Sequence, residues 1–337
     1  MNYVFFIDGT GQRIVRPKRA DSTNVCKLWN MCESVPQVQE LFAHDGPGSI
    51  LPIGGRMFGA DADKILTRLY VELANKFKLL ERQKVAIESR RIRMSSQEVE
   101  FLESPVRVFI FGFSRGAYIA RMLTHIIATC GVPRDGKVAK NVLKHWRKGA
   151  ASRCTLDTFR REKILSDPIC VEYVGLWDCV RARIKKVRSA DYYFLDDRVV
   201  ACRHAIAANE YRSKFSVDRI HSERAREMVF PGSHCDVGGG YRHYNAIADV
   251  TLAWIANEGI RRGLLTQEKC LLPEELVVQN AMIHDSTKER IVGIPLYGFS
   301  RIKRRYLYGT PRHECMKHRH VIQRERVLLR NLKEGNR

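Results

Sequence analysis

The sequence predicts a protein of the α/β class, with a doubly wound, mostly parallel sheet and helical insertions. Short apolar runs of strand length alternate along the chain with amphipathic stretches of helical length. The run VRVFIF at 106–111 has the composition of a strand that is buried on both faces. Strands that alternate with helices pair in parallel and are covered on both sides of the sheet.

The first third of the chain contains two expected strands and two expected helices. YVFFI at 3–7 is a buried strand that ends at Asp8-Gly9, and ELFAH at 40–44 is a strand closed by DGPGS. The stretch 22–34 begins with N-capping residues and has helical spacing. Residues 61–80 form a long amphipathic helix, which we expect to continue into the charged, exposed stretch 81–100.

The later elements follow the same alternation. The strand at 106–111 leads directly into a helix at 115–130, and the polar, basic stretch 131–168 is typical of a helical insertion. The remaining expectations are strands at 170–177 and 226–230 and helices at 197–212 and 246–264.

One domain is the simplest organisation of this pattern. We find no internal repeat and no clear boundary before about residue 300, so we expect a catalytic domain over 1–300 with insertions near 81–104 and 131–168. The segment 301–337 has twelve Lys and Arg against three Glu, which makes it a basic C-terminal segment.

The composition of the chain indicates its cellular compartment and the classes of partner that it could bind. The ten cysteines form no C-x-x-C pair, which favours reduced thiols in a cytoplasmic-type compartment. Neither a run of eighteen apolar residues nor a signal-peptide pattern is present, so membrane association or signal-independent export are the alternatives to a cytoplasmic location. The net charge of +21 attracts polyanions, and both nucleic acid and an anionic phospholipid surface fit it. The oligomeric state stays open.

The strongest chemical signal is the pentapeptide Gly112-Phe113-Ser114-Arg115-Gly116, which fits G-x-S-x-G. An apolar strand precedes it and an apolar-striped helix follows it, which is the setting of a nucleophile elbow. The turn is so tight that its flanking positions must lack bulky side chains. Ser114 is then the predicted nucleophile, and the N–H of Arg115 is a predicted oxyanion donor.

Two later residues complete a predicted triad. Asp178 ends the strand at 170–177, and His234 follows the strand at 226–230, so both belong to the carboxyl edge of the sheet. Taken singly, Asp178 resembles a capping aspartate and His234 a structural loop histidine. The order Ser, Asp, His after successive strands is the one that an α/β-hydrolase-like sheet requires. His204, His221 and His313 are alternative bases, although their charged or helical surroundings favour structural roles.

Residues around these three have supporting roles. Gly9 or Thr10 supplies the second oxyanion N–H, and Asp8 fixes that loop; a plain turn is the alternative. In PGSHCDVGGGY at 231–241, Asp236 is expected to fix the loop of His234. No G-K-[ST] follows the glycines, which opposes a phosphate loop. We predict no cofactor and no metal; HECMKHRH at 313–320 lacks a firm zinc spacing.

These motifs resemble those of the DUF2235 family, the Tle1-like catalytic domain of type VI secretion phospholipase effectors. The matching blocks span about residues 1–265 in the family's order: FFIDGTGQ, FGFSRGAYIAR, VGLWDCV, RHAIAANEYRSKF, FPGSHCDVGGGY and ADVTLAWI. The resemblance implies an α/β-hydrolase fold and serine esterase activity on phospholipids, with Ser114, Asp178 and His234 as triad. The chain departs from the family's pattern at Cys235, at Cys179, and in lacking a large C-terminal region.

The sequence therefore predicts a serine lipolytic hydrolase that cleaves phospholipid esters through an acyl-enzyme. Two alternatives stay open. One is a basic nucleic-acid-binding or interaction protein on a hydrolase-like fold. The other is an esterase with a non-lipid substrate.

Overall fold

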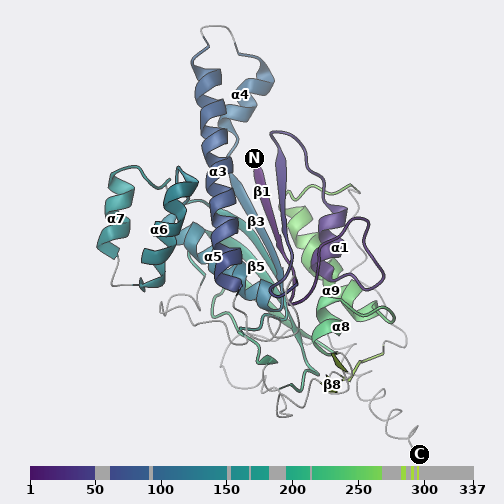
Figure 1. The fold of residues 1–337 in the computed structure, drawn as a ribbon. Coiled ribbons are helices and arrows are strands. Elements are labelled where there is room, and N and C mark those ends of the chain that lie inside the picture. Colours follow the sequence, from purple (N-terminus) through teal and green to yellow (C-terminus); the bar gives the residue numbers. More distant parts are fainter. Residues whose placement is uncertain are drawn as a thin grey trace, which may run out of the picture.

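A six-stranded, all-parallel sheet forms the centre of the fold (Figure 1). The computed structural model describes residues 1–49, 61–90, 94–149, 153–166, 168–181, 195–212, 215–267, 282–285, 290–291 and 294–295. The strands are β1 (Asn2–Ile7), β2 (Gln39–His44), β3 (Arg107–Phe113), β4 (Val171–Trp177), β5 (Val199–Ala207) and β6 (Ala225–Phe230). The predicted α/β class with a parallel sheet is confirmed.

The strand order is β2-β1-β3-β4-β5-β6, so the chain reverses its direction of winding between β1 and β3. In open parallel sheets, ligands bind beyond the carboxyl ends of the strands at such a switch point. The residues that follow β1 and β3 are Asp8-Gly9-Thr10 and Ser114. The topology therefore places these two loops side by side at the edge where a site is expected.

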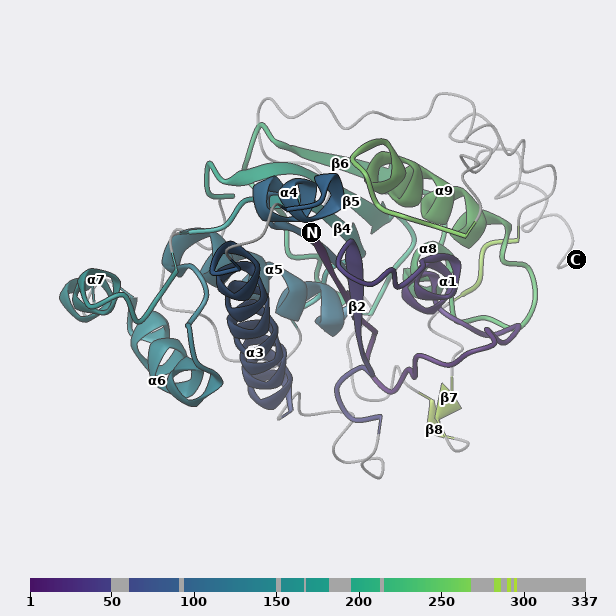
Figure 2. The ribbon, with the colours of Figure 1, turned by 90° about the horizontal axis from the view of Figure 1, so that it is seen from above.

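Helices cover both faces of the sheet (Figure 2). One layer contains α1 (Asn24–Met31), α8 (His234–Gly238) and α9 (Ala246–Arg261). The other contains α3 (Ala62–Glu88), α4 (Ser96–Glu103), α5 (Arg115–Cys130), α6 (Gly136–Arg147) and α7 (Arg153–Arg161). A separate antiparallel pair is formed by β7 (Arg290–Ile291) and β8 (Ile294–Pro295).

The position of strand β1 between two helical layers explains why its sequence is continuously apolar. Tyr3, Phe5 and Ile7 pack into the core beneath α3 and α5, while Val4 and Phe6 pack into the core beneath α1 and α9. Each side chain is buried, because both faces of a doubly wound sheet are covered. Burial of each large apolar side chain contributes roughly 1.5–3 kcal/mol.

The predicted helix at 197–212 is wrong, because most of this segment is strand β5. The segment is rich in Ala, which favours helix in isolation. Here it lies between β4 and β6 in parallel register, and pairing with both neighbours outweighs that local preference. Arg203 and His204 are buried in the strand: Arg203 forms an ion pair with Glu258, and Nδ1 of His204 lies 2.8 Å from Oε1 of Glu227.

The two expected insertions are helical where the structure describes them. Helix α3 extends beyond residue 80 and ends at Glu88, and α4 begins with a capping box between Ser95 and Glu98. The stretch 131–168 contains α6, which lies beside α3 in Figure 1, and α7, which lies on the far side of α6. The basic segment 301–337, with His313 and the HECMKHRH motif, lies outside the described residues.

Two further predictions concern thiols and membranes. Seven of the described cysteines are free thiols: Cys26, Cys32, Cys130, Cys170, Cys179, Cys202 and Cys235. Within the described ranges, no helix has both the length and the apolar character that crossing a bilayer requires.

Candidate active site

Ser114 occupies a strained turn between β3 and α5. Its backbone has φ 58° and ψ −125°, a conformation that L residues rarely adopt outside functional turns. A Cβ at Gly116 would lie 2.3 Å from the carbonyl oxygens of Ile7 and Asp8, and a Cβ at Gly112 would lie 2.7 Å from Cα of Ala117. Both flanking positions therefore require glycine, as the G-x-S-x-G pattern predicts.

Asp178 lies at the end of β4 and is fully buried. Its Oδ1 accepts the N–H of Ala207 at 3.0 Å, and its own N–H donates to the carbonyl of Ala205 at 2.7 Å. These two bonds to β5 fix the carboxylate in one orientation. Its other oxygen, Oδ2, lies 2.5 Å from Nδ1 of His234.

His234 is the first residue of α8, a helix of five residues, where the sequence indicated only a loop. Its ring packs against Phe113, with centroids 4.6 Å apart, and against the edge of Phe215 at 5.0 Å. Phe113 directly precedes Ser114, so this contact holds the imidazole beside the elbow. The ring of Phe113 also explains one glycine of the GGG run, since a Cβ at Gly238 would meet it at 2.0 Å.

The backbone of Ser114 forms hydrogen bonds to residues that precede and follow Asp178. The Ser114 N–H donates to the carbonyl of Trp177 at 3.0 Å, and the Ser114 carbonyl accepts the N–H of Val180 at 3.2 Å. The turn after β3 and the turn after β4 are thus connected directly. Ser114, Asp178 and His234, predicted from three separate motifs, converge at the carboxyl edge of the sheet.

The loop after β1 is organised by Asp8. Its Oδ1 accepts the N–H of Gly9 at 2.6 Å and the hydroxyl of Thr23 at 2.8 Å. Its Oδ2 has no hydrogen-bond partner among the described residues, and burial raises the pKa of this carboxyl to about 7 despite those two bonds. Because the Gly9 N–H is already engaged, Thr10 is the better placed of the two predicted oxyanion donors in this loop.

Arg115, the other predicted oxyanion donor, is the first residue of α5. The N-terminus of a helix presents N–H groups that are free of intrahelical partners, together with the positive end of the helix dipole. A negative charge that develops next to Ser114 would therefore meet favourable electrostatics from α5.

Asp236 organises the turn that presents His234. Its Oδ2 accepts the N–H of Ser233 at 2.8 Å and the N–H of His284 at 3.0 Å, and its Oδ1 lies 2.5 Å from Nδ1 of His284. The ring of His284 stacks on Tyr241. Asp236 thus connects the N-terminus of α8 to residues 282–285 and lies in a supporting position.

Sequence reasoning missed the ion pair of Glu210 and Arg212 next to His234. Oε2 of Glu210 accepts the His234 N–H at 3.4 Å and lies 2.7 Å from Nη2 of Arg212. Burial opposes ionisation of Glu210, but the hydrogen bonds and charge of Arg212 hold its pKa below the ordinary value. Arg212 also lies over Phe215, 3.8 Å from the ring centroid. The only signal for this pair was the block RHAIAANEYRSKF, which gave no role to either residue.

The alternative base His204 is engaged elsewhere. Its Nδ1 lies 2.8 Å from Oε1 of Glu227 and its Nε2 accepts the N–H of Cys179 at 3.0 Å. Burial opposes ionisation of Glu227, yet His204 and Arg219 lower its pKa to about 2. Among the described residues, no group of three or more His, Cys, Asp or Glu could hold a metal ion.

Comparison with known proteins agrees with this architecture. Residues 1–258 match the family described as the type VI secretion system phospholipase effector, Tle1-like, catalytic domain. The uncharacterized protein YEL023C of Saccharomyces cerevisiae is 23% identical over 236 residues, which cover 64% of this chain and 32% of that protein.

Two solved structures are also similar. The crystal structure of an uncharacterized protein from Pseudomonas aeruginosa aligns with a TM-score of 0.50 and 18% identity, over 81% of this chain and 47% of the other. The Tle1 effector bound to the VgrG spike aligns with a TM-score of 0.38 and 17% identity, over 71% of this chain and 51% of the other. The chain thus spans about a third to a half of the length of these relatives. Because the family match covers most of the sequence, the chain belongs to the Tle1-like catalytic domain family of type VI secretion phospholipase effectors.

Proposed function

We propose that the chain is a serine lipolytic hydrolase that cleaves carboxylic esters of phospholipids through an acyl-enzyme on Ser114. The observation that carries the proposal is the buried Asp178–His234 pair, with its 2.5 Å contact, packed against the strained Ser114 turn. Family membership supports the substrate class.

In the proposed first step, Oγ of Ser114 attacks the carbonyl carbon of the ester and its proton passes to Nε2 of His234. The bond from Nδ1 to Asp178 supports this role, because a proton held on Nδ1 leaves Nε2 as the acceptor. The carboxylate then stabilises the imidazolium that forms. His234 returns the proton to the departing alcohol, and the acyl group stays on Ser114.

In the second step, water attacks the acyl-enzyme with His234 as base, which releases the fatty acid and restores Ser114. In both steps a negative charge develops on the former carbonyl oxygen. We assign the N–H groups of Arg115 and Thr10 to that charge. Removal of one such donor typically costs about a hundredfold to a thousandfold in kcat.

The family description names type VI secretion effectors, so export by that route belongs to the same proposal. A hydrolase with the same triad but a soluble, non-lipid ester as substrate is the remaining alternative. Parallel assays on phospholipid vesicles and on soluble short-chain esters separate the two.

A fluorophosphonate probe tests the nucleophile directly. The wild type, Ser114→Ala and the control Cys235→Ser are incubated with the probe, and the adduct is located by mass spectrometry. We expect the wild type and Cys235→Ser to carry the label on Ser114 and Ser114→Ala to carry none. A wild type that takes no label, or takes it on another residue, contradicts the proposal.

A further inference from the structure

Two loops next to the proposed active site have exposed basic side chains, four in the first loop and one in the second. The first follows Thr10 and contains four basic residues within RIVRPKR at 13–19. The second follows α8 and contains Arg242 beside His243 and Tyr244. We call these side chains the rim surface: Arg13, Arg16, Lys18, Arg19, Arg242 and Tyr244.

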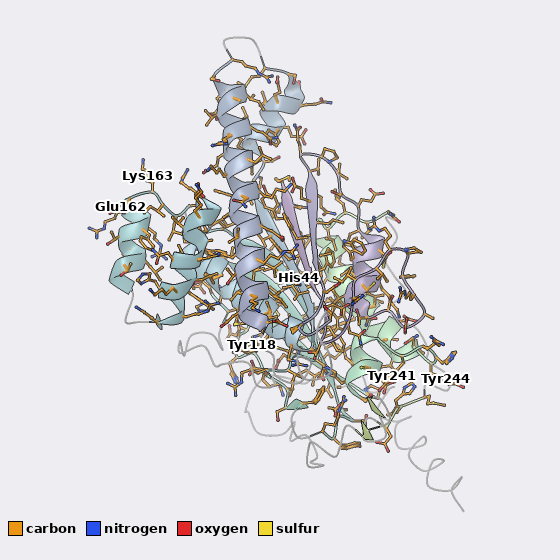
Figure 3. All side chains as sticks on the ribbon, in the orientation of Figure 1. His44, Tyr118, Glu162, Lys163, Tyr241 and Tyr244 are labelled. Atoms are coloured by element: carbon orange, nitrogen blue, oxygen red, sulfur yellow. The ribbon has the colours of Figure 1, made fainter. Side chains whose placement is uncertain are left out.

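The two loops are adjacent in space. Nδ2 of Asn245 donates to the carbonyl of Ala20 at 3.3 Å, and Thr23 pairs with Gly239 in an isolated antiparallel bridge. In Figure 1 the first loop runs beside α1 towards α8, and Figure 3 shows Tyr241 and Tyr244 beside α8 at the margin of the molecule. The two ends of the first loop and the second loop therefore lie at the same sheet edge as His234, while Arg16 reaches back along α1 to Trp29.

Among the described residues, no ion pair neutralises the charges of the rim surface. Its five basic residues are exposed. None of the five forms an ion pair with a carboxylate of the described residues: Arg13 donates to the carbonyl of Ser49, and Arg16 donates to that of Trp29 and lies over its ring. Two exposed acids lie nearby: Asp21 follows the first loop, and Asp285 follows His284, whose ring lies beside Tyr241 and Tyr244. Five basic residues against these two acids leave the local balance positive.

Exposed apolar groups accompany the charges. Tyr244 has 61% of its surface exposed and a φ of 61°, so the backbone holds an aromatic side chain outward at some conformational cost. Met282, in the described segment that Asp236 holds through His284, is 45% exposed. Tyrosine at a membrane–water interface places its ring at the level of the head groups.

We infer that the rim surface docks on the head groups of an anionic phospholipid bilayer and so brings the Ser114 edge to its substrate. This inference rests on the proposed lipolytic function. Basic clusters attract the negative surface potential of such a bilayer, and an exposed ring beside them inserts at the interface. Single-stranded nucleic acid favours stacking platforms of several aromatic rings in a basic groove, whereas the rim surface has one exposed ring.

The experiment measures binding to vesicles in the Ser114→Ala background, so that lipid is not consumed. The test variant replaces Lys18, Arg19 and Arg242 by Gln. These three side chains have no ion pair with described residues, so their replacement leaves known contacts intact. The matched control replaces Lys137, Lys140 and Lys144, three exposed lysines along one face of α6, by Gln. It removes the same number of positive charges from a helix outside both rim loops.

Binding is measured by co-sedimentation with phosphatidylglycerol–phosphatidylcholine vesicles and with pure phosphatidylcholine vesicles. Each basic residue near an anionic surface contributes about fivefold in affinity, so the rim variant should bind anionic vesicles on the order of a hundredfold more weakly. We expect the α6 control to stay within about threefold of the parent, because distant charges are screened at physiological salt. Binding of the parent should weaken steeply in high salt.

Three results would overturn the inference: equal losses in the rim variant and the α6 control, parent-like binding by the rim variant, or a rim variant that loses affinity for a DNA duplex but not for vesicles. The last would assign the surface to nucleic acid. Failure of the proposed function is separate, because it would appear as absent labelling of Ser114 by the fluorophosphonate probe in the wild type, a readout that needs no bilayer. The vesicle measurement does not depend on Ser114.

Discussion

Oδ2 of Asp178 lies 2.5 Å from Nδ1 of His234, and both side chains are almost completely buried. The carboxylate has no freedom to turn away, because its other oxygen is bonded to the N–H of Ala207 on the neighbouring strand. This arrangement fixes both the tautomer and the direction of the imidazole. It is the part of the site on which the proposed chemistry depends most.

Replacement of Asp178 by Asn tests the tautomer. Asn can keep the bond from Ala207, but its NH₂ group would donate to Nδ1 of His234 and so place the imidazole proton on Nε2. A protonated Nε2 cannot accept the proton of Ser114. We expect kcat for ester hydrolysis to fall on the order of 10⁴-fold. The measurement is steady-state kinetics, with circular dichroism and thermal melting as controls for folding. A folded variant that loses less than about tenfold would show that Asp178 does not orient the base.

Replacement of Gly116 by Ala tests the tightness of the elbow. A Cβ there would lie 2.3 Å from two backbone carbonyl oxygens, so β1 and α5 must separate. Overpacking of this kind typically costs about 1–3 kcal/mol of unfolding free energy. The matched control is Gly259→Ala in α9, where the nearest atom is the flexible end of Leu264 at 3.2 Å. Helix propensity favours Ala there by up to about 1 kcal/mol.

Urea unfolding measures both glycine variants. The expected result is a clear loss for Gly116→Ala and a neutral or slightly stabilising effect for Gly259→Ala. Similar effects of the two substitutions would mean that β1 and the elbow are not in the close contact described here.

Replacement of Asp8 by Asn tests the buried carboxyl beside the oxyanion loop. Burial raises the pKa of Asp8 from its ordinary value of 3.8 to about 7, against the bonds from Gly9 and Thr23. Below pH 3.8 both the folded and the unfolded chain hold the proton. As the pH rises towards 7, only the unfolded chain releases it, so the contribution of Asp8 to wild-type stability falls by about 4 kcal/mol across this window and levels off above it.

Asn keeps the acceptor oxygen and does not titrate. The unfolding free energy of Asp8→Asn relative to the wild type should therefore rise between about pH 4 and pH 7 and stay constant above. Urea unfolding of both proteins over this range provides the comparison. Parallel stability curves for the two proteins would show that Asp8 ionises in the folded state at its ordinary pKa.

Much of this fold and site was predictable from the sequence because the decisive signals are local. Strands buried on both faces are continuously apolar, and the Ser114 turn requires glycines at fixed positions. Strand β5 was not predictable in this way, because its Ala-rich sequence favours helix and only pairing with β4 and β6 makes it a strand. The Glu210–Arg212 pair was missed for a related reason. Its role depends on contact with His234, which lies on a different element and cannot be read from nearby residues.

The most direct test of the account is hydrolysis of phospholipid vesicles by four proteins: the wild type, Ser114→Ala, His234→Ala and Cys235→Ser. Released fatty acid is quantified against time, with circular dichroism to confirm folding. We expect release by the wild type and by Cys235→Ser, and loss of at least about a thousandfold in the Ser114 and His234 variants. Fatty acid release that survives both Ser114→Ala and His234→Ala, or depends on Cys235 instead, would contradict the proposed triad.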